Sequence, residues 1–119
     1  MGDQIVSSKA LEQFCAALMM AENVPEEEAQ IIASHLVEAE MFGVSSHGVS
    51  RASIYLKRLH EGVVNAKWAC RIQEEHPASV LWDACNSMGM VTGVRAMERC
   101  IEKARESGCC LIAVNHSNH

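Results

Sequence analysis

Apolar residues recur every three or four positions through the first part of the chain, which is the spacing of one face of an α-helix. The first such segment follows Ser7-Ser8, a pair that can cap a helix. The second opens at Pro25 and a run of glutamates, residue types that favour the first turn and the positive end of the helix dipole. It stops at Gly43. The pattern therefore predicts two amphipathic helices in succession.

A third segment with helical spacing can be capped by Ser45 or Ser46, and it ends at Gly62. The three segments with helical spacing together predict a small helical layer. Beyond Gly62 the composition shifts and the helical spacing is lost. We therefore expect an N-terminal helical region over residues 1–62 and a second region, the beginning of an α/β cofactor-binding domain, over residues 63–119.

The second region predicts strands on both sides of a long helix. Residues 67–74 could form a strand, and residues 78–82 form a short one after a turn. An amphipathic helix over residues 90–104 stops at Gly108. The continuous apolar run at residues 110–114 is typical of a strand buried on both faces. The apolar face of the helix comprises Met90, Val94, Met97, Ile101 and Ala104.

These elements predict an α/β (α+β) fold in which a helical layer precedes the start of a mixed or parallel sheet. A buried parallel strand needs neighbours, and two or three strands cannot cover both of its faces. The chain stops directly after such a strand. We therefore expect the fold to be incomplete here, with this chain as the N-terminal portion of a longer protein, either a fragment or a split chain.

Composition and charge exclude some classes of protein. Of the 119 residues, 49% are apolar, so a buried core is possible. The net charge of −5 argues against nucleic-acid binding, which needs clustered Lys and Arg. No run of about 18 apolar residues exists, so we expect no membrane span. No secretory signal and no Cys-x-x-Cys pair occur, so the six cysteines predict buried, reduced thiols in a cytoplasmic protein.

The stretch from Gly43 to Arg51 concentrates groups that catalysis uses: hydroxyls, an imidazole and a guanidinium. If it is helical, His47 and Arg51 share a face, and Ser46 lies at the helix start, where outward N–H groups favour anions. Arg51 could then hold a carboxylate through two parallel hydrogen bonds, while His47 contacts the ligand or carries a proton. The alternative is a solvated helix face on which Ser46 is only an N-cap.

A second candidate group ends the chain. His119 follows the apolar run at residues 110–114, and residues just beyond the carboxyl ends of parallel strands commonly line α/β active sites. A histidine there suits proton transfer, and an ordinary loop histidine is the alternative. His116 lies three residues before His119, but no third ligand is placed with them, so we expect no metal site. No Gly-x-Gly-x-x-Gly motif and no phosphate-binding loop motif occurs.

Taken in order, these residues resemble one family. The motif Gly43-x-x-Ser46-His47-Gly48-Val49-x-Arg51 is similar to the N-terminal region of the type 2 malate/L-lactate dehydrogenase family, which includes ureidoglycolate, sulfolactate, 2,3-diketogulonate and piperideine-carboxylate oxidoreductases. Each further motif is weakly specific when taken alone, but the ordered set of motifs is specific to this family and covers nearly the whole chain. It continues through Tyr55, Gly62, Asn65, Asp83, Asn86, Gly89, Ala96-Met97, the run from Ile101 to Gly108, and Ser117-Asn118-His119.

The resemblance implies an oxidoreductase that uses NAD or NADP to interconvert 2-hydroxy or 2-imino acids and 2-oxo acids, on a fold other than the usual Rossmann domain. It also implies a homodimer with the active site near the subunit contact. Ser46 and His47 match a hydrogen-bonded pair of the active site, and Arg51 matches the clamp for the substrate carboxylate. Asn118 and His119 match residues beside the nicotinamide. Either His47 or His119 could exchange the proton.

Some positions depart from the family pattern. Ser45 stands where the family usually has Asp, and Asn115-His116 stands where it has Arg-Asn. The loop after Asp83 has less glycine than usual. The departures leave open the identity of the acid, and they motivate the alternative of a non-catalytic binding or dimerisation module that retains the fold. The choice between NAD and NADP is also open. Because later segments of the family supply most cofactor contacts, we expect the 119-residue chain alone to be inactive.

Overall fold

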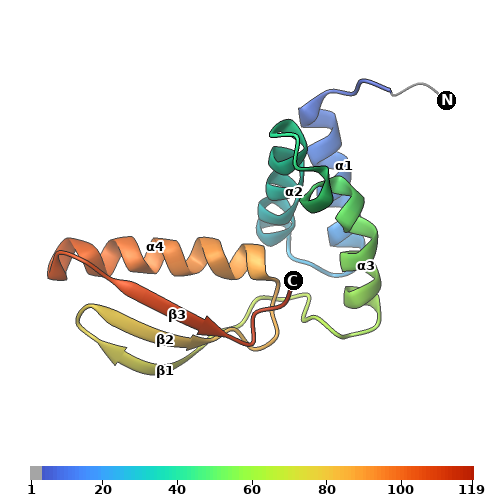
Figure 1. Ribbon diagram of the computed structural model, residues 1–119. Helices are drawn as coiled ribbons and strands as arrows, with labels where there is room; N and C mark the ends of the chain where they lie inside the picture. The colour runs from blue at the N-terminus through green and yellow to red at the C-terminus, as the bar shows by residue number, and fades with distance from the viewer. Residues whose placement is uncertain (1–3) are drawn as a thin grey trace. The chain divides into compact units, whose positions relative to one another are not determined.

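The computed structural model describes residues 4–119, which divide into two compact units between Glu61 and Gly62. The first unit is helical, and the second combines a sheet with one long helix (Figure 1). This is the mixed α/β class expected from the sequence. Assignment of the second unit to a cofactor-binding domain stays a prediction.

The helical unit contains five elements in chain order. Two long helices, α1 (Ser8–Ala21) and α2 (Glu26–Met41), come first and pack against each other. Two single 3₁₀ turns follow, η1 (Ser45–His47) and η2 (Val49–Arg51), and both contact α2. The last element is α3 (Ala52–His60), which contacts η2 and α1. The three predicted helices therefore all occur, although the third is shorter than its apolar spacing suggested.

The ends of α1 and α2 follow from local sequence signals. Ser7 caps α1, since its Oγ accepts a hydrogen bond from the Ala10 N–H at 3.5 Å. Pro25 occupies the N-cap position of α2, and the acidic residues Glu26 to Glu28 fill its first turn, near the positive end of the dipole. Beyond α2, Gly43 adopts φ +75°, a left-handed conformation that glycine tolerates without strain.

The core of this unit forms where the apolar faces of α1 and α2 meet. Small and branched residues alternate there, so the two helices approach closely, and burying these apolar side chains supplies the main stabilising free energy of the unit. The fully or almost fully buried members are Cys15, Ala16, Met19, Ala29, Ile32, Ala33, Leu36 and Val37.

The start of the third helix differs from the prediction. Neither Ser45 nor Ser46 caps it, because both lie in η1 and α3 begins only at Ala52. Gly48 separates the two 3₁₀ turns with an extended backbone, φ −91° and ψ −154°. A helix cannot continue through that conformation, so the serines end up in a loop held against α2.

The second unit is a three-stranded sheet with order β1-β2-β3. Strands β1 (Arg71–His76) and β2 (Ser79–Asp83) form an antiparallel hairpin. The long helix α4 (Gly89–Ser107) then crosses one face of the sheet and leads to β3 (Leu111–Asn115), which pairs in parallel with β2 (Figure 1). The expected strand–helix–strand order is therefore confirmed.

Charged and aromatic contacts join the sheet to the segments beside it. Glu75 of β1 accepts hydrogen bonds from Arg99 Nη2 at 3.0 Å and from Lys103 Nζ at 2.9 Å, both on α4. These two cations hold the pKa of the Glu75 carboxyl below its usual range, with the Lys103 hydrogen bond as the largest cause. In the core, the buried Trp82 ring lies 6.3 Å from the ring of Trp68.

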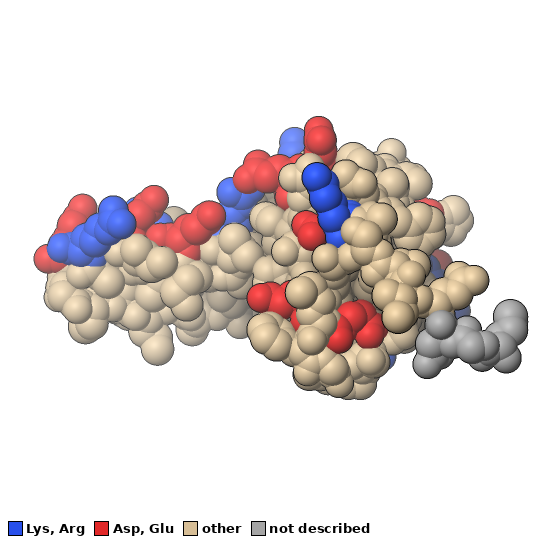
Figure 2. All heavy atoms as spheres, turned by 90° about the horizontal axis from the view of Figure 1, so that it is seen from above, with Lys and Arg blue, Asp and Glu red and all other residues tan. Residues whose placement is uncertain are grey.

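Two predictions of burial are wrong for the described residues. Strand β3 pairs only with β2, and Leu111 on it is 66% exposed instead of buried on both faces. On α4, Met97 is 60% exposed although it belongs to the predicted apolar face, and Ile101 is exposed too. Figure 2 shows charged side chains along one edge of the surface that carries α4, with uncharged surface beside them. The amphipathic pattern is present, but the part of its apolar face that carries Met97 and Ile101 is left exposed by the described residues.

The cysteines are free, as expected, but they are not generally buried. Cys15 is the only one fully enclosed among residues 4–119, and burial raises the pKa of its thiol. Cys109 is exposed and the other four are half-buried. Of these four, Cys100 lies on α4, and Cys70, Cys85 and Cys110 lie in the segments next to the strands. Within residues 4–119, no helix has the length and apolar content to cross a bilayer.

Candidate functional site

The loop between α2 and α3 carries the first group of candidate residues. Ser46 and His47 both lie on η1 and are exposed, and the Ser46 Oγ lies 2.9 Å from the His47 Nδ1. The hydroxyl donates or accepts in this bond according to the imidazole tautomer. A bond at Nδ1 restrains the orientation of the ring, and Nε2 is the nitrogen that could exchange a proton.

Arg51 occupies the end of η2, one short turn further along the chain. Its side chain is half-buried, and its Nε is enclosed with no hydrogen-bond partner among the residues that the structure describes. A buried N–H without a partner is costly, since folding removes it from water without replacing the lost bond. The guanidinium therefore presents a donor for which the described protein supplies no acceptor.

The expectation that His47 and Arg51 share one helical face is wrong. They belong to separate 3₁₀ turns, and the extended Gly48 between them breaks the helical spacing on which that expectation depended. Tyr55, which would follow His47 and Arg51 on such a face, is a buried residue of α3. The two turns nevertheless contact each other, so the compact loop keeps the imidazole and the guanidinium in one small region.

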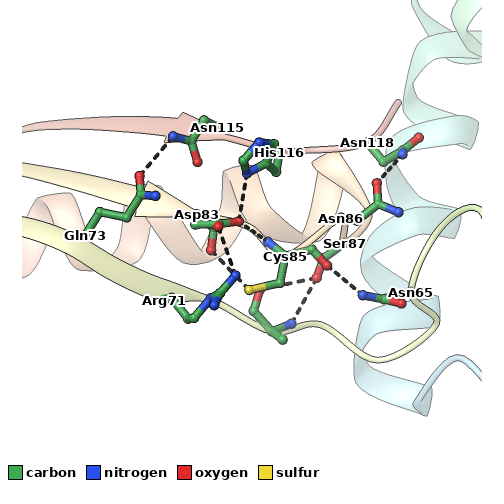
Figure 3. Close-up of polar contacts among 11 residues, drawn as sticks. Asn65, Arg71, Gln73, Asp83, Cys85, Asn86, Ser87, Asn115, His116 and Asn118 are labelled. Carbon is green, nitrogen blue, oxygen red and sulfur yellow. Dashed lines mark hydrogen bonds and ion pairs between the residues drawn. The ribbon is translucent and has the colours of Figure 1, made fainter.

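The second group of candidates follows β3. The Asn118 main chain is pinned to the loop before α4: its N–H donates to the Ser87 carbonyl at 2.9 Å, and its carbonyl accepts from the Gly89 N–H at 2.7 Å. The Asn118 side chain donates from Nδ2 to Asn86 Oδ1 at 2.5 Å (Figure 3). His119 is exposed at the end of the chain. Asn118 and His119 thus lie at the carboxyl end of a parallel strand, where α/β proteins commonly bind ligands.

Gly89 shows why the loop before α4 approaches Asn118 so closely. A Cβ atom at this position would lie 2.9 Å from the Asn118 carbonyl oxygen and 3.1 Å from the Ser117 Oγ. The first separation is shorter than real Cβ atoms show against backbone, so glycine permits the bond from its N–H to that carbonyl.

A polar cluster that the sequence pattern did not reveal surrounds Asp83 at the end of β2. This carboxylate is only 6% exposed and accepts a hydrogen bond from the Cys85 N–H at 2.8 Å. The Arg71 guanidinium approaches it at 3.2 Å, and so does the His116 Nδ1 (Figure 3). The pKa of Asp83 is lowered, first by the Cys85 N–H and then by His116 and Arg71. The cluster lines an open hollow of about 440 Å³.

Replacing Asp83 with asparagine is expected to destabilise the protein at pH 7. The folded pKa of Asp83 lies below its unfolded value of about 3.9, so its contribution is present above that pH and is lost as pH falls through the folded pKa. The difference in melting temperature between wild type and Asp83→Asn should therefore shrink as the pH falls below the unfolded pKa. Thermal unfolding from pH 7 down to pH 3 measures this.

Glu106→Gln is the matched control, because it removes the same charge from an exposed position on α4. A loss of stability in Asp83→Asn that persists unchanged at pH 3 would show that the carboxylate charge is not the cause.

The two groups of candidate residues belong to different units. Ser46, His47 and Arg51 lie in the helical unit, while Asn118 and His119 lie in the sheet unit. The structure brings the members of each group together, and their union in one site stays a prediction. Across residues 4–119, no group of three or more His, Cys, Asp or Glu side chains has the arrangement of a metal site.

Comparison with known proteins identifies the family. The sequence model of the malate/L-lactate dehydrogenase family matches residues 6–119. The chain belongs to the malate/L-lactate dehydrogenase family. It is 37% identical to a malate dehydrogenase of Pyrococcus abyssi over 92% of its own length, and 38% identical to an L-sulfolactate dehydrogenase of Methanothermobacter thermautotrophicus over 86%. The structure of malate dehydrogenase from Pyrococcus horikoshii OT3 superimposes with a TM-score of 0.93 at 36% identity, over 96% of the chain.

The chain spans about a third of the length of these members of the malate/L-lactate dehydrogenase family. It covers 30% of each of the two curated relatives and 33% of the Pyrococcus horikoshii structure. The fold expected from the resemblance is thereby confirmed for this part of the family architecture.

The positions that depart from the pattern of the malate/L-lactate dehydrogenase family all make contacts inside the protein. The Ser45 Oγ donates to a carboxylate oxygen of Glu40 at 2.9 Å. The Asn115 Nδ2 donates to Gln73 Oε1 at 2.9 Å, and His116 pairs with Asp83. These side chains therefore have structural partners of their own.

Proposed function

We propose that this chain is the N-terminal part of an NAD(P)-dependent oxidoreductase that interconverts 2-hydroxy or 2-imino acids and 2-oxo acids. Membership of the malate/L-lactate dehydrogenase family supports the class of reaction. The single observation that carries the role of this chain is the half-buried Arg51, which lies in the turn directly after the one that holds the hydrogen-bonded Ser46–His47 pair. Its guanidinium is a cation that can pair with the carboxylate of an acidic substrate.

Arg51 would bind the substrate carboxylate through two parallel N–H donors of its guanidinium. A guanidinium suits this task, because its planar fork matches the two carboxylate oxygens and stays charged at any physiological pH. Partial burial strengthens the contact, since fewer water molecules compete for the donors. The clamp thereby orients the C2 carbon and its oxygen or nitrogen substituent.

His47 would hold the proton that leaves or joins that substituent at its Nε2 atom, since Nδ1 is engaged by Ser46. In the oxidation of a 2-hydroxy acid, the hydroxyl proton moves to His47 as the C2 hydrogen departs as hydride. In the reduction of a 2-oxo acid, the same nitrogen returns a proton to the carbonyl oxygen. Ser46 restrains the ring during both steps and does not itself change.

The cofactor would be NAD or NADP, and it supplies or accepts the hydride when bound. Asn118 and His119 fit a part of its site by their chemistry, because an amide and an imidazole can hydrogen-bond a carboxamide ring substituent. Their place after the carboxyl end of β3 agrees with that role. The dehydrogenases of this family use NAD(P), and the choice between the two cofactors is not determined by these residues.

Enzyme assays of the whole protein test the proposed reaction. Incubation with NADH or NADPH and a panel of 2-oxo acids is expected to oxidise the reduced cofactor, which is followed by the loss of its absorbance. Malate and sulfolactate with the oxidised cofactors test the reverse direction, since relatives are named for these substrates. A folded protein that turns over none of these acids with either cofactor would contradict the catalytic proposal.

A non-catalytic binding or dimerisation module is the second candidate. It is favoured by the internal contacts of Ser45, Asn115 and His116, which show that the departures from the family pattern are accommodated structurally. Thermal unfolding with saturating NAD or NADP separates the two functions, because a ligand that binds only the folded state raises its stability. Stabilisation by a cofactor favours the enzyme, and its absence favours the module. We propose a cytoplasmic homodimer in either case.

A further inference from the structure

The loop that carries Ser46 and His47 is held by a side chain outside the family motif. Glu40 lies in the last turn of α2, and its carboxylate reaches over the loop that follows. We propose that Glu40 is a positioning residue for the catalytic pair, which keeps His47 oriented by closing the loop onto α2. This inference rests on the proposed dehydrogenase function and assigns a role to a residue that touches neither substrate nor cofactor.

The two oxygens of the carboxylate hold the two ends of the loop. Oε2 accepts a hydrogen bond from the Ser45 Oγ at 2.9 Å, at the start of η1. Oε1 accepts from the Val49 N–H, also at 2.9 Å, at the start of η2. Ser46 and His47 lie between these two contacts. A single carboxylate therefore clamps the segment on both sides of the catalytic pair.

Gly48 gives independent evidence for the closeness of this clamp. The residue is buried, and a Cβ atom added to it would lie 2.2 Å from Glu40 Oε1 and 2.5 Å from Glu40 Cδ. No side chain could stand there unless Glu40 moved away. Glycine directly after His47 is thus needed for the carboxylate to reach the Val49 N–H.

Main-chain bonds to α2 support the same closure, but they end before the two 3₁₀ turns, whose own main-chain bonds stay within the loop. The Glu40 carbonyl accepts from the Gly43 N–H at 2.9 Å, and the Ala39 carbonyl accepts from the Val44 N–H at 2.8 Å. Both bonds end before η1 begins. Beyond them, the side chain of Glu40 is the element of α2 that bonds to both 3₁₀ turns.

The clamp matters for catalysis because proton transfer depends steeply on geometry. Misplacing a reacting group by about 1 Å can lower a rate by roughly 100-fold. Without the carboxylate, the Val49 N–H and the Ser45 hydroxyl lose their acceptor, and rotation about the Gly48 backbone is less restricted. The Ser46–His47 pair then samples orientations in which Nε2 does not face the substrate.

The test compares Glu40→Ala, Glu40→Gln and the control Glu38→Ala in the whole protein. Glutamine can still accept from the Val49 N–H and can donate to the Ser45 Oγ, so it should restore most of what alanine loses. Glu38 is an exposed glutamate on the same helix, with no part in this loop. We expect Glu40→Ala to lower kcat on the order of 30-fold, within the range that misplacement causes, with little change in KM.

Hydrogen–deuterium exchange of the peptide spanning residues 45–51 supplies a readout that does not depend on turnover. Exchange should speed up in Glu40→Ala, recover in Glu40→Gln and stay unchanged in Glu38→Ala, while the core of α2 keeps its protection. Unchanged exchange in Glu40→Ala would overturn the clamp. Faster exchange with unchanged kcat would reduce Glu40 to a structural residue and overturn the positioning role. A wild-type protein without any turnover would instead refute the proposed function, and the exchange data would still decide the clamp.

Discussion

Replacing His47 with alanine in the whole protein is expected to lower kcat by about 1,000-fold, because removal of a general acid or base costs roughly 100- to 10,000-fold. We propose His47 as the proton carrier, and the Ser46 hydroxyl lies 2.9 Å from its Nδ1 atom and restrains the ring. KM should change little, because the carboxylate clamp is untouched. Steady-state kinetics with the best 2-oxo acid measures both constants.

Added imidazole provides a second measurement for the same variant. A small base that enters the vacated space should restore part of the activity of His47→Ala, because it can exchange the proton in place of the missing side chain. If His47 were only structural, imidazole would restore no activity. His35→Ala is the matched control: His35 is exposed on α2, and its Nδ1 bonds to the Ile31 carbonyl of its own helix. His119→Ala should lose less kcat than His47→Ala. The reverse order, with imidazole rescue of His119→Ala, would assign the proton to His119.

Replacing Arg51 with alanine is expected to lower kcat/KM by about 300-fold, mostly through KM. Truncating one partner of a buried, charged hydrogen-bonded pair costs roughly 2–5 kcal/mol of binding free energy. A 300-fold change in kcat/KM corresponds to about 3.5 kcal/mol, which lies within this range. In the proposed mechanism the substrate carboxylate pairs with the guanidinium, and Arg51→Ala removes that pair. Initial rates across a range of 2-oxo acid concentrations give the change.

Two further variants show whether the geometry of the guanidinium matters. Arg51→Lys keeps the charge but loses the planar pair of donors, so it should recover only part of the affinity. Lys57→Ala removes an exposed cation on α3 whose ion pair with Glu61 is long, at 3.9 Å, and it should leave kcat/KM unchanged. An Arg51→Ala variant with wild-type KM would remove the clamp from the mechanism.

The local part of the fold is predictable from the sequence because its signals lie within a few residues of each other. Ser7, Pro25 and the glutamates of the first turn specify where α1 and α2 begin, and apolar spacing specifies which faces pack. The change of pattern near Gly62 coincides with the division between the two compact units. The order of Ser46, His47 and Arg51 likewise indicates the class of protein from the sequence alone.

Other features depend on contacts between distant residues. Apolar spacing extended the third helix back to Ser45, but Glu40 accepts the Val49 N–H and Gly48 becomes extended, so two 3₁₀ turns form instead. The Asp83 cluster draws Arg71 from one strand and His116 from beyond another, and no short motif links them. The exposure of Leu111 depends on which element covers its face, which its own sequence does not encode.

The sequence by itself therefore predicted the helices, the strand–helix–strand order and the family. It also indicated Ser46, His47 and Arg51 as candidate site residues. Only the tertiary structure decided how those side chains are presented. It placed His47 and Arg51 on separate turns, left the Arg51 Nε without a described acceptor, and closed the loop with Glu40. The physical reason is that helix and strand propensities act between near neighbours, whereas the orientation of a loop is set by whichever distant donors and acceptors folding brings within hydrogen-bond distance.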